Sequence, residues 1–143
     1  LNLGLLLGEL GRLPEAAAEF RAALRLDPNS AVAAYNLAEI LKGDRPSEAL
    51  VWYRRAVSVR PSEGKYGCAL ALCLAESGQV GQAMEVLEAL VRDRTDHSPV
   101  YAILGQIYRH QGRICAAIDL FAKAAANDRL PQADRDAFLE QAR

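Results

Sequence analysis

The sequence predicts an all-α protein built from repeated helix–turn–helix units, and three observations predict it. A leucine followed by Gly or Ala returns every 33 or 34 residues, at Leu3, Leu37, Leu70 and Leu104. An alanine returns with the same spacing, at Ala16, Ala49, Ala83 and Ala117. A glycine lies between these two landmarks in each unit, at Gly11, Gly43, Gly78 and Gly112.

Each landmark has a packing reason. A second large residue follows each repeated leucine by four positions, which places both on one apolar stripe of a helix. These second positions are Leu7, Leu41, Leu74 and Tyr108. The small residues let two helices approach closely, and a larger side chain four positions after each alanine fills the space between them. These larger side chains are Phe20, Tyr53, Leu87 and Phe121.

The pattern resembles the tetratricopeptide repeat, a helix–turn–helix unit of about 34 residues. The resemblance covers the whole chain and predicts a single domain over residues 1–143. Its units are expected at 1–30 (partial), 31–63, 64–97 and 98–130, with 131–143 as a capping helix or a truncated repeat. The resemblance implies a right-handed α-solenoid superhelix of stacked units, in which the first helix of each unit lines a concave groove.

Nine helices are expected, over residues 1–10, 14–26, 31–42, 46–59, 63–77, 80–93, 98–111, 114–127 and 132–142. Proline suits a first helical turn, where a missing N–H costs nothing, and it stands near three of these starts, at Pro14, Pro46 and Pro99. Serine is a good N-cap, and it precedes three first helices, at Ser30, Ser62 and Ser98. The four turn glycines suit the left-handed conformation that often ends a helix.

Two departures from the repeat concern its turns and junctions. The second unit is one residue shorter than the others, and the deletion falls in the turn after Gly43. The first two units close with Pro28 and Pro61, whereas Thr95 and Arg129 stand at that place in the third and fourth. We expect the last two junctions to bend differently.

Composition and motifs exclude several classes of function. The chain has 143 residues and a net charge of −1, with no basic region, so nucleic acid is not an expected partner. No apolar run reaches the roughly 20 residues that a membrane helix needs, so membrane insertion is not expected. Motifs for phosphate-binding loops, metal sites and nucleophilic catalysis are missing, and the prediction is a protein that is not an enzyme and has no cofactor.

The three cysteines are Cys68, Cys73 and Cys115, and none forms a CxxC pair. Three scattered cysteines do not make a disulfide framework. We interpret them as small packing residues, the alternative being a reactive thiol.

The candidate binding residues lie on the first helices, off the leucine stripe. They are Asn2, Leu5, Tyr35, Asn36, Glu39, Lys65, Leu72, Gln106 and Arg109. Some family members bind peptide backbones with an asparagine immediately before the repeated leucine, and Asn2 and Asn36 hold that place in the first two units. The alternative for Asn36 is an amide that is only solvated or that bonds a neighbouring helix. Other members clamp a terminal carboxylate with five side chains, of which only Asn36 and Lys65 have counterparts, so that clamp is not expected.

The stretch "VWYRRAV" (51–57) combines aromatic and basic residues. In the repeat, Tyr53 is the packing aromatic, while Arg54 and Arg55 point outward. A solvated convex face, with Trp52 partly covering a neighbouring helix, is the favoured interpretation. A cationic contact surface is the alternative.

The function expected from the resemblance is a non-catalytic scaffold that binds a peptide or helix of a protein partner in its concave groove. A recruitment or regulatory arm of a larger enzyme or electron-transfer protein is one alternative. Self-association through the exposed ends of the solenoid, giving a homo-oligomer, is another. The sequence carries no signal peptide and its natural start is expected to lie before Leu1, so a cytoplasmic location is favoured only weakly and the compartment stays open.

Overall fold

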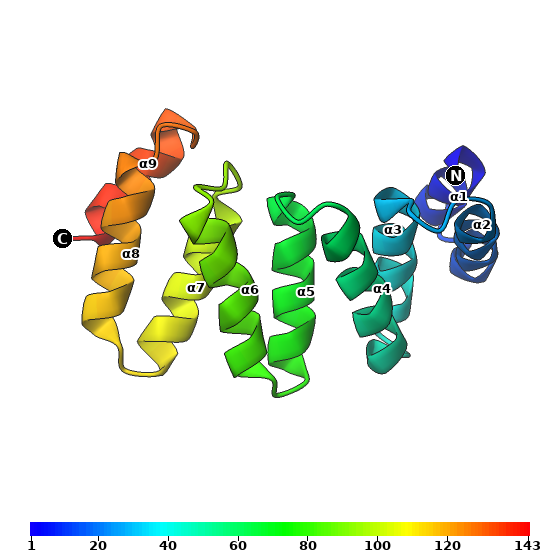
Figure 1. Cartoon of the computed structure of the whole chain (residues 1–143), viewed down its shortest axis with the longest axis horizontal. Coiled ribbons are helices and arrows are strands. Elements are labelled where there is room, and N and C mark those ends of the chain that lie inside the picture. The colour runs from blue at the N-terminus through cyan, green and yellow to red at the C-terminus, as the bar shows by residue number, and fades with distance from the viewer. The chain divides into compact units, whose positions relative to one another are not determined.

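The computed structural model describes all 143 residues, as nine α-helices with no strand. The chain divides into two compact units, residues 1–61 and 62–143, which we call unit 1 and unit 2. The helices of unit 1 are α1 (Asn2–Glu9), α2 (Leu13–Leu26), α3 (Ala31–Leu41) and α4 (Pro46–Val59). Those of unit 2 are α5 (Gly64–Glu76), α6 (Val80–Arg92), α7 (Pro99–His110), α8 (Ile114–Ala126) and α9 (Gln132–Gln141) (Figure 1).

The observed helices confirm the predicted all-α fold of helix–turn–helix repeats, and each expected helix has its counterpart. Within each unit every helix packs against the next one along the chain, and α5 also contacts α7. The repeated alanines and the larger residues that follow them are buried, and Tyr53, Phe20 and Phe121 are among the largest fully buried side chains. Whether residues 1–143 form a single domain stays a prediction.

Glycine allows the closest helix contacts. A Cβ added at Gly4 would lie 2.9 Å from Cε1 of Phe20, and one added at Gly105 would overlap the ring of Phe121. The small residue of α1 or α7 therefore receives the aromatic ring of the following helix, as the repeat pattern predicts.

Two of the three predicted serine caps are wrong. The Ser30 hydroxyl accepts a hydrogen bond from the Ala33 N–H at 3.3 Å and caps α3 as expected. Helix α5 instead begins after Glu63, so Ser62 lies one position too early. Ser98 does precede α7, but its hydroxyl donates to the Asp134 carboxylate at 2.6 Å and makes no cap bond. The three predicted prolines do lie in first helical turns.

Three of the four turn glycines adopt the left-handed conformation, with φ of 73° at Gly11, 80° at Gly78 and 72° at Gly112. The residue after each donates its N–H to a carbonyl five positions back, as Arg12 does to Leu7 at 2.9 Å. This pattern is the Schellman motif of helix ends. Gly43 does not adopt positive φ. The shorter turn of the second repeat, residues 31–63, closes instead through a bond from Arg45 N to Leu41 O at 2.7 Å.

The junctions without proline differ from each other. Helix α6 ends in a Schellman motif in which Arg94, at φ 50°, takes the place of glycine, and the Thr95 N–H donates to Leu90 O at 3.1 Å. Proline at position 95 could not make that bond, which explains the threonine. Helix α8 ends at Asn127 in extended conformation, as α2 does at Asp27. Thr95 therefore changes the junction, whereas Arg129 does not.

Helix α9 covers the apolar side of the last repeat. Phe138 is buried and stacks on Phe121, with ring centroids 5.7 Å apart and planes 13° from parallel. It also lies 5.9 Å from the ring of Tyr101. Both predicted alternatives, a capping helix and a truncated repeat, are compatible with an α9 that packs against the last repeat.

Candidate functional site

Unit 1 has a hollow of about 430 Å³ lined mainly by α1 and α3, which we call the first-helix hollow. Its lining residues are Gly4, Leu5, Gly8, Glu9, Leu13, Phe20, Asn36, Glu39 and Ile40. It brings together three of the candidate binding residues, Leu5, Asn36 and Glu39. Its walls are apolar, and its charged members are both carboxylates, Glu9 and Glu39.

Asn36 is half-buried, and its Nδ2 donates to the Val32 carbonyl of its own helix at 2.8 Å. Of the two alternatives expected from the sequence, a bond to a neighbouring helix is not observed, and an amide that is only solvated stays open. One amide N–H is used by the bond to Val32. An asparagine side chain has a second N–H and an acceptor oxygen, which suits recognition of a peptide group.

The Glu39 carboxylate is held in place by hydrogen bonds. It accepts a hydrogen bond from the Tyr53 hydroxyl at 2.6 Å and one from Lys42 Nζ at 2.9 Å. Tyr35 packs against Tyr53, and their ring centroids are 6.1 Å apart. Tyr35 and the exposed Asn2 do not line the first-helix hollow. The asparagine pair predicted from the repeat is therefore not gathered into one hollow.

The candidate residues of unit 2 lie on the exposed surface of α5 and α7. Lys65 and Leu72 belong to α5, and Gln106 and Arg109 belong to α7. The Arg109 guanidinium lies 4.9 Å from the centroid of the Phe121 ring, so part of its position is fixed by packing. Helices α5 and α7 are in contact. The two hollows described below for unit 2 are lined by other residues.

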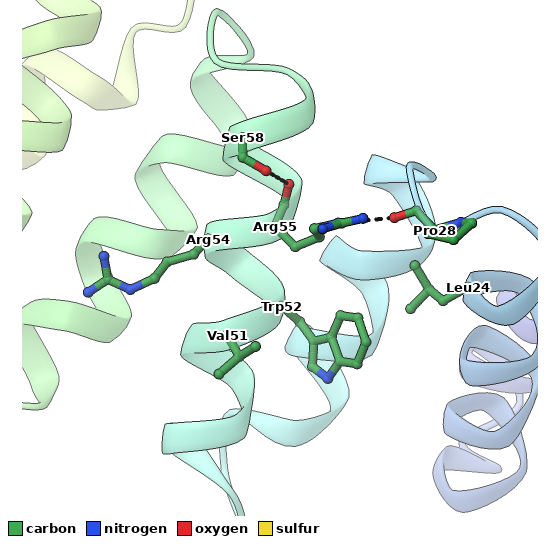
Figure 2. Close-up of a pocket in the computed structure, with 7 residues that line it drawn as sticks. All are labelled: Leu24, Pro28, Val51, Trp52, Arg54, Arg55 and Ser58. Atoms are coloured by element: carbon green, nitrogen blue, oxygen red, sulfur yellow. Dashed lines mark hydrogen bonds between the residues drawn. The ribbon is translucent and has the colours of Figure 1, made fainter.

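A second hollow of unit 1, of about 510 Å³, lies between α2 and α4, and we call it the second-helix hollow (Figure 2). Its lining residues are Leu24, Pro28, Val51, Trp52, Arg54, Arg55 and Ser58. Arg55 reaches across it, donating from Nε to Pro28 O at 3.1 Å and from a terminal nitrogen to Asn29 Oδ1 at 3.3 Å.

Trp52 is the unusual member of this hollow. Its Nε1–H is buried and has no hydrogen-bond partner in the protein. A buried donor without an acceptor costs about 1–3 kcal/mol. The sequence predicted a Trp52 that partly covers a neighbouring helix. The hollow was missed, because it also needs Leu24 of α2 and Pro28 of the α2–α3 turn, which are distant in sequence.

The corresponding hollow of unit 2 lies between α6, α7 and α8 and has a volume of about 330 Å³. Two carboxylates, Glu88 and Asp119, and two cations, Arg92 and Lys123, line it. The Tyr108 hydroxyl donates to Glu88 at 2.7 Å. Burial, together with this bond, raises the pKa of Tyr108 to about 12. Its balanced charges distinguish it from the second-helix hollow of unit 1.

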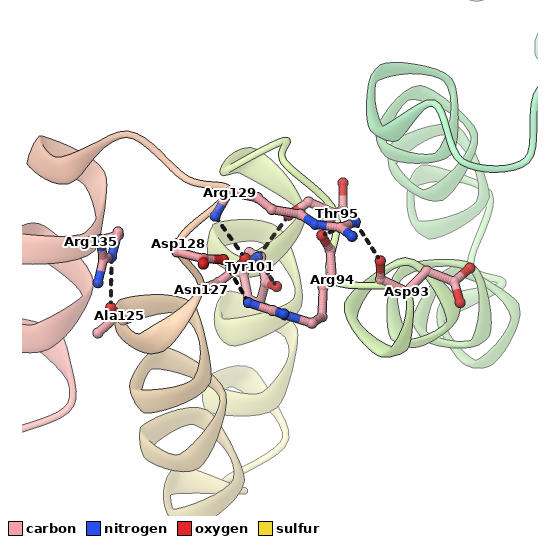
Figure 3. A network of polar contacts seen from close by, with 9 residues as sticks. All are labelled: Asp93, Arg94, Thr95, Tyr101, Ala125, Asn127, Asp128, Arg129 and Arg135. Atoms are coloured by element: carbon pink, nitrogen blue, oxygen red, sulfur yellow. Dashed lines mark hydrogen bonds and ion pairs between the residues drawn. The ribbon is translucent and has the colours of Figure 1, made fainter.

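A polar cluster joins the α6–α7 and α8–α9 junctions (Figure 3). Asn127 is buried, and its Nδ2 donates to Thr95 O and to the Tyr101 hydroxyl, both at 2.9 Å. Its Oδ1 accepts from the Arg129 N–H at 3.1 Å. Arg129 also donates to the carbonyls of Asp93 and Arg94. Because the polar groups of this cluster bond one another, the cluster is structural.

A hollow of about 550 Å³ lies beside the polar cluster, and its lining residues are Ser62, Leu90, Asp93, Thr95, Asp96 and Arg129.

The cysteines divide into two kinds. Cys68 and Cys73 are buried, as expected for packing residues, and burial raises the pKa of the Cys68 thiol to about 12. Cys115 is exposed, so the packing interpretation is wrong there. No group of three or more His, Cys, Asp or Glu side chains could hold a metal ion. None of the nine helices combines the length and the apolar composition needed to cross a membrane.

The family model described as tetratricopeptide repeat matches residues 1–64 and 68–134. Among curated proteins, human protein O-mannosyl-transferase TMTC1 is 30% identical over 124 residues, or 87% of this chain. The antiviral innate immune response effector IFIT1 of Macaca fascicularis is 31% identical over 76 residues, or 53% of this chain. The chain spans only 14% and 16% of the lengths of these two relatives.

Several solved structures share the fold. One crystal structure of MamA aligns with a TM-score of 0.75 and 23% identity, covering 90% of this chain and 70% of that one. Another has a TM-score of 0.75 and 16% identity, covering 99% and 93%. The MamA RS-1 ArsTM double mutant aligns with a TM-score of 0.71 and 17% identity, covering 99% and 89%. This likeness confirms the predicted α-solenoid fold class.

Proposed function

Because the chain belongs to the tetratricopeptide repeat family, we propose that it is a non-catalytic protein-interaction scaffold whose first helices hold an extended peptide of a partner. The observation that carries the proposal is the first-helix hollow, where Leu5, Asn36 and Glu39 come together from two successive first helices. Fold alone does not fix function, so the proposal rests on the chemistry of this hollow.

The hollow offers three kinds of contact to a peptide. An apolar side chain packs against Leu5, Phe20 and Ile40. The second N–H and the oxygen of the Asn36 amide pair with a backbone peptide group, whatever side chain that residue carries. The carboxylates of Glu9 and Glu39 favour a neutral or basic residue over an acidic one. In unit 2, a separate set of candidate contact residues is proposed on α5 and α7, namely Lys65, Leu72, Gln106 and Arg109.

The test uses peptides selected from a random displayed library against the whole chain. We expect Leu5→Glu and Asn36→Ala to weaken a selected peptide about tenfold or more, while helical circular dichroism and the melting temperature stay close to those of the wild type. Asn29→Ala is the matched control, since Asn29 lies in an exposed turn outside the hollow. Combining Asn36→Ala with Lys65→Glu tests the contribution proposed for unit 2. Unchanged binding by folded Leu5→Glu and Asn36→Ala variants would show that the first-helix hollow is not the site.

A second candidate function is a recruitment or regulatory arm of a larger protein. The favouring observation is the match to about one seventh of human TMTC1, named as a protein O-mannosyl-transferase. The full-length coding sequence decides this candidate, because a protein without any further domain would remove it.

A third candidate is self-association through α1. Leu3, Leu6 and Leu10 are exposed by 51%, 51% and 62%, whereas Leu37, the counterpart of Leu3 in α3, is fully buried in a helix that contacts α2. Clustered exposed leucines mark an interaction surface. Sedimentation at high concentration should give a larger species for the wild type than for Leu6→Glu. A wild type that stays monomeric would refute this candidate.

A further inference from the structure

The second-helix hollow shares no residue with the first-helix hollow, and the proposed scaffold function does not use it. Leu24, Pro28, Val51 and Trp52 make it apolar, and Val51 is 61% exposed. Figure 2 shows Leu24 and Pro28 facing Trp52 across the hollow, with Arg55 above the indole. The hollow is thus an apolar pocket with a cation along one edge.

Arg55 is fixed in position but its charge is not neutralised. Its two hydrogen-bond partners are the Pro28 carbonyl and the Asn29 amide oxygen, which are both uncharged. These bonds hold the guanidinium at the edge of the hollow before any ligand arrives. A guanidinium has five N–H donors, so donors remain for a carboxylate.

The second observation is the Trp52 indole. Its buried Nε1–H has no acceptor, and it is the buried side-chain donor in the protein that lacks one. Most buried polar groups in native proteins have a partner, and an exception calls for an explanation. No polar bond holds the indole in its present rotamer. Because the N–H is buried, a ligand oxygen reaches it only if the indole changes rotamer.

Charge separates this hollow from the other three. Its charged lining residues are Arg54 and Arg55, with no carboxylate. The first-helix hollow has two carboxylates and no cation, and the hollow between α6, α7 and α8 has two of each. The hollow beside the polar cluster has two carboxylates and one cation. Of the four hollows described, the second-helix hollow is therefore the one that combines apolar lining residues with a net positive lining.

We propose that the second-helix hollow binds an acidic peptide segment of a partner protein, with one large apolar side chain against Val51 and Trp52 and a carboxylate on Arg55. The apolar side chain contributes buried apolar surface, and the carboxylate on Arg55 fixes the direction in which the peptide runs along the hollow. A carbonyl or carboxylate oxygen of the same segment meets the Trp52 N–H. This site is independent of the peptide site proposed on the first helices.

The chain offers a direct measurement, because Trp52 is its single tryptophan. The probe is a capped peptide with one leucine flanked on each side by two glutamates. We expect a saturable change in Trp52 emission as this peptide is added to the whole chain, weakening as salt is raised. Two matched peptides, one with glutamines for the glutamates and one with alanine for the leucine, should each bind about tenfold more weakly.

Protein variants locate the site. Val51→Glu and Arg55→Gln should each weaken the acidic peptide about tenfold, and both positions are exposed, so helical circular dichroism should stay unchanged. Arg12→Gln is the control for lost charge, because Arg12 is exposed, belongs to unit 1 and does not line the hollow. It should bind like the wild type. Asn36→Ala should also bind the acidic peptide normally, which separates this test from that of the first-helix hollow.

Four results would overturn the proposal. One is no change in Trp52 emission with a folded protein at any peptide concentration. Equal binding of the glutamine peptide would show that charge plays no part. Loss of binding in Asn36→Ala with none in Val51→Glu would place the peptide elsewhere. A change caused by vesicles of anionic phospholipid and not by the peptide would assign the hollow to a lipid surface.

Discussion

The α2–α3 junction of unit 1 and the α6–α7 junction of unit 2 hold the same place in the repeat but are built differently. Pro28 shapes the first, Ser30 caps the helix that follows, and Arg55 from α4 bonds the Pro28 carbonyl. At the second, Arg94 takes left-handed φ, Thr95 donates to Leu90, and Asn127 bonds the Thr95 carbonyl. In each case a side chain from the next repeat donates a hydrogen bond to a backbone carbonyl of the junction. The repeat therefore fixes how the helices pack, whereas the residues and hydrogen bonds of the junctions vary.

The largest difference between the junctions should appear when their asparagines are removed. Asn127→Ala leaves Thr95 O and the Tyr101 hydroxyl without their buried partner, and we expect a loss of about 3 kcal/mol in the free energy of unfolding. Asn29→Ala removes one exposed bond to Arg55 and should cost under about 0.5 kcal/mol. Urea denaturation followed by circular dichroism measures both. Equal losses would mean that the buried cluster of unit 2 adds nothing that the exposed junction of unit 1 lacks.

Helix contact provides the next comparison. An alanine at Gly105 would place its Cβ in the ring of Phe121, whereas one at Gly8 meets no atom within 4 Å. Gly105→Ala should cost about 2 kcal/mol through overpacking. Gly8→Ala should stabilise the chain by up to about 1 kcal/mol through helix propensity. Thermal melting of the two variants gives the opposite signs directly. Stabilisation by Gly105→Ala would contradict the close packing of α7 and α8.

Most of the fold follows from the sequence, because each repeat position carries one packing demand. A leucine, a small residue and an aromatic at fixed spacing determine the helix pairs, and the helix bounds were predicted to within about two residues. The errors lie at Gly43, where the turn is shorter, at Ser62, where the helix begins one residue later, and at Ser98, whose hydroxyl bonds Asp134 instead. The left-handed conformation of Arg94 could not be predicted, since glycine is the residue that usually indicates this conformation in a sequence.

Less of the candidate site follows from the sequence. The helical phase did select Leu5, Asn36 and Glu39, which line one hollow because successive first helices lie near each other. The second-helix hollow was missed because "VWYRRAV" was interpreted within a single helix. Its walls come from Leu24 and Pro28 as well, and the missing partner of Trp52 is a property of the folded chain alone.

Serine capping gives a smaller test of the two junctions. Ser30→Ala removes the bond from Ala33 N to the Ser30 hydroxyl and should cost about 1 kcal/mol. Ser98→Ala removes no cap bond, and only its bond to Asp134 is lost, so the cost should be about half as large. Denaturation of both variants under one condition measures the difference. A larger cost for Ser98→Ala would show that its bond to α9 outweighs a helix cap.

The smallest effect, and the one most specific to the difference between the junctions, concerns Arg94. At φ 50° any residue with a Cβ is strained, by about 1–2 kcal/mol, and glycine is not. Glycine also costs about 0.5–1 kcal/mol of backbone entropy on folding. Arg94→Gly and Arg94→Ala both lose the exposed ion pair to Asp128, so their difference isolates the backbone. We expect the glycine variant to be the more stable by about 0.5 kcal/mol.

The matched pair at Asp27, which holds the same place in unit 1, should show the opposite order. Asp27 is extended, with φ −133°, so glycine relieves no strain there and only adds flexibility to the unfolded chain. Asp27→Gly should therefore be less stable than Asp27→Ala by about 0.5–1 kcal/mol. Because all four variants lack the native side chain, the reversal of sign depends on backbone conformation alone. If glycine were the less stable choice at both positions, Arg94 would not end α6 as a left-handed cap, and the substitution of Thr95 for proline would lose its explanation.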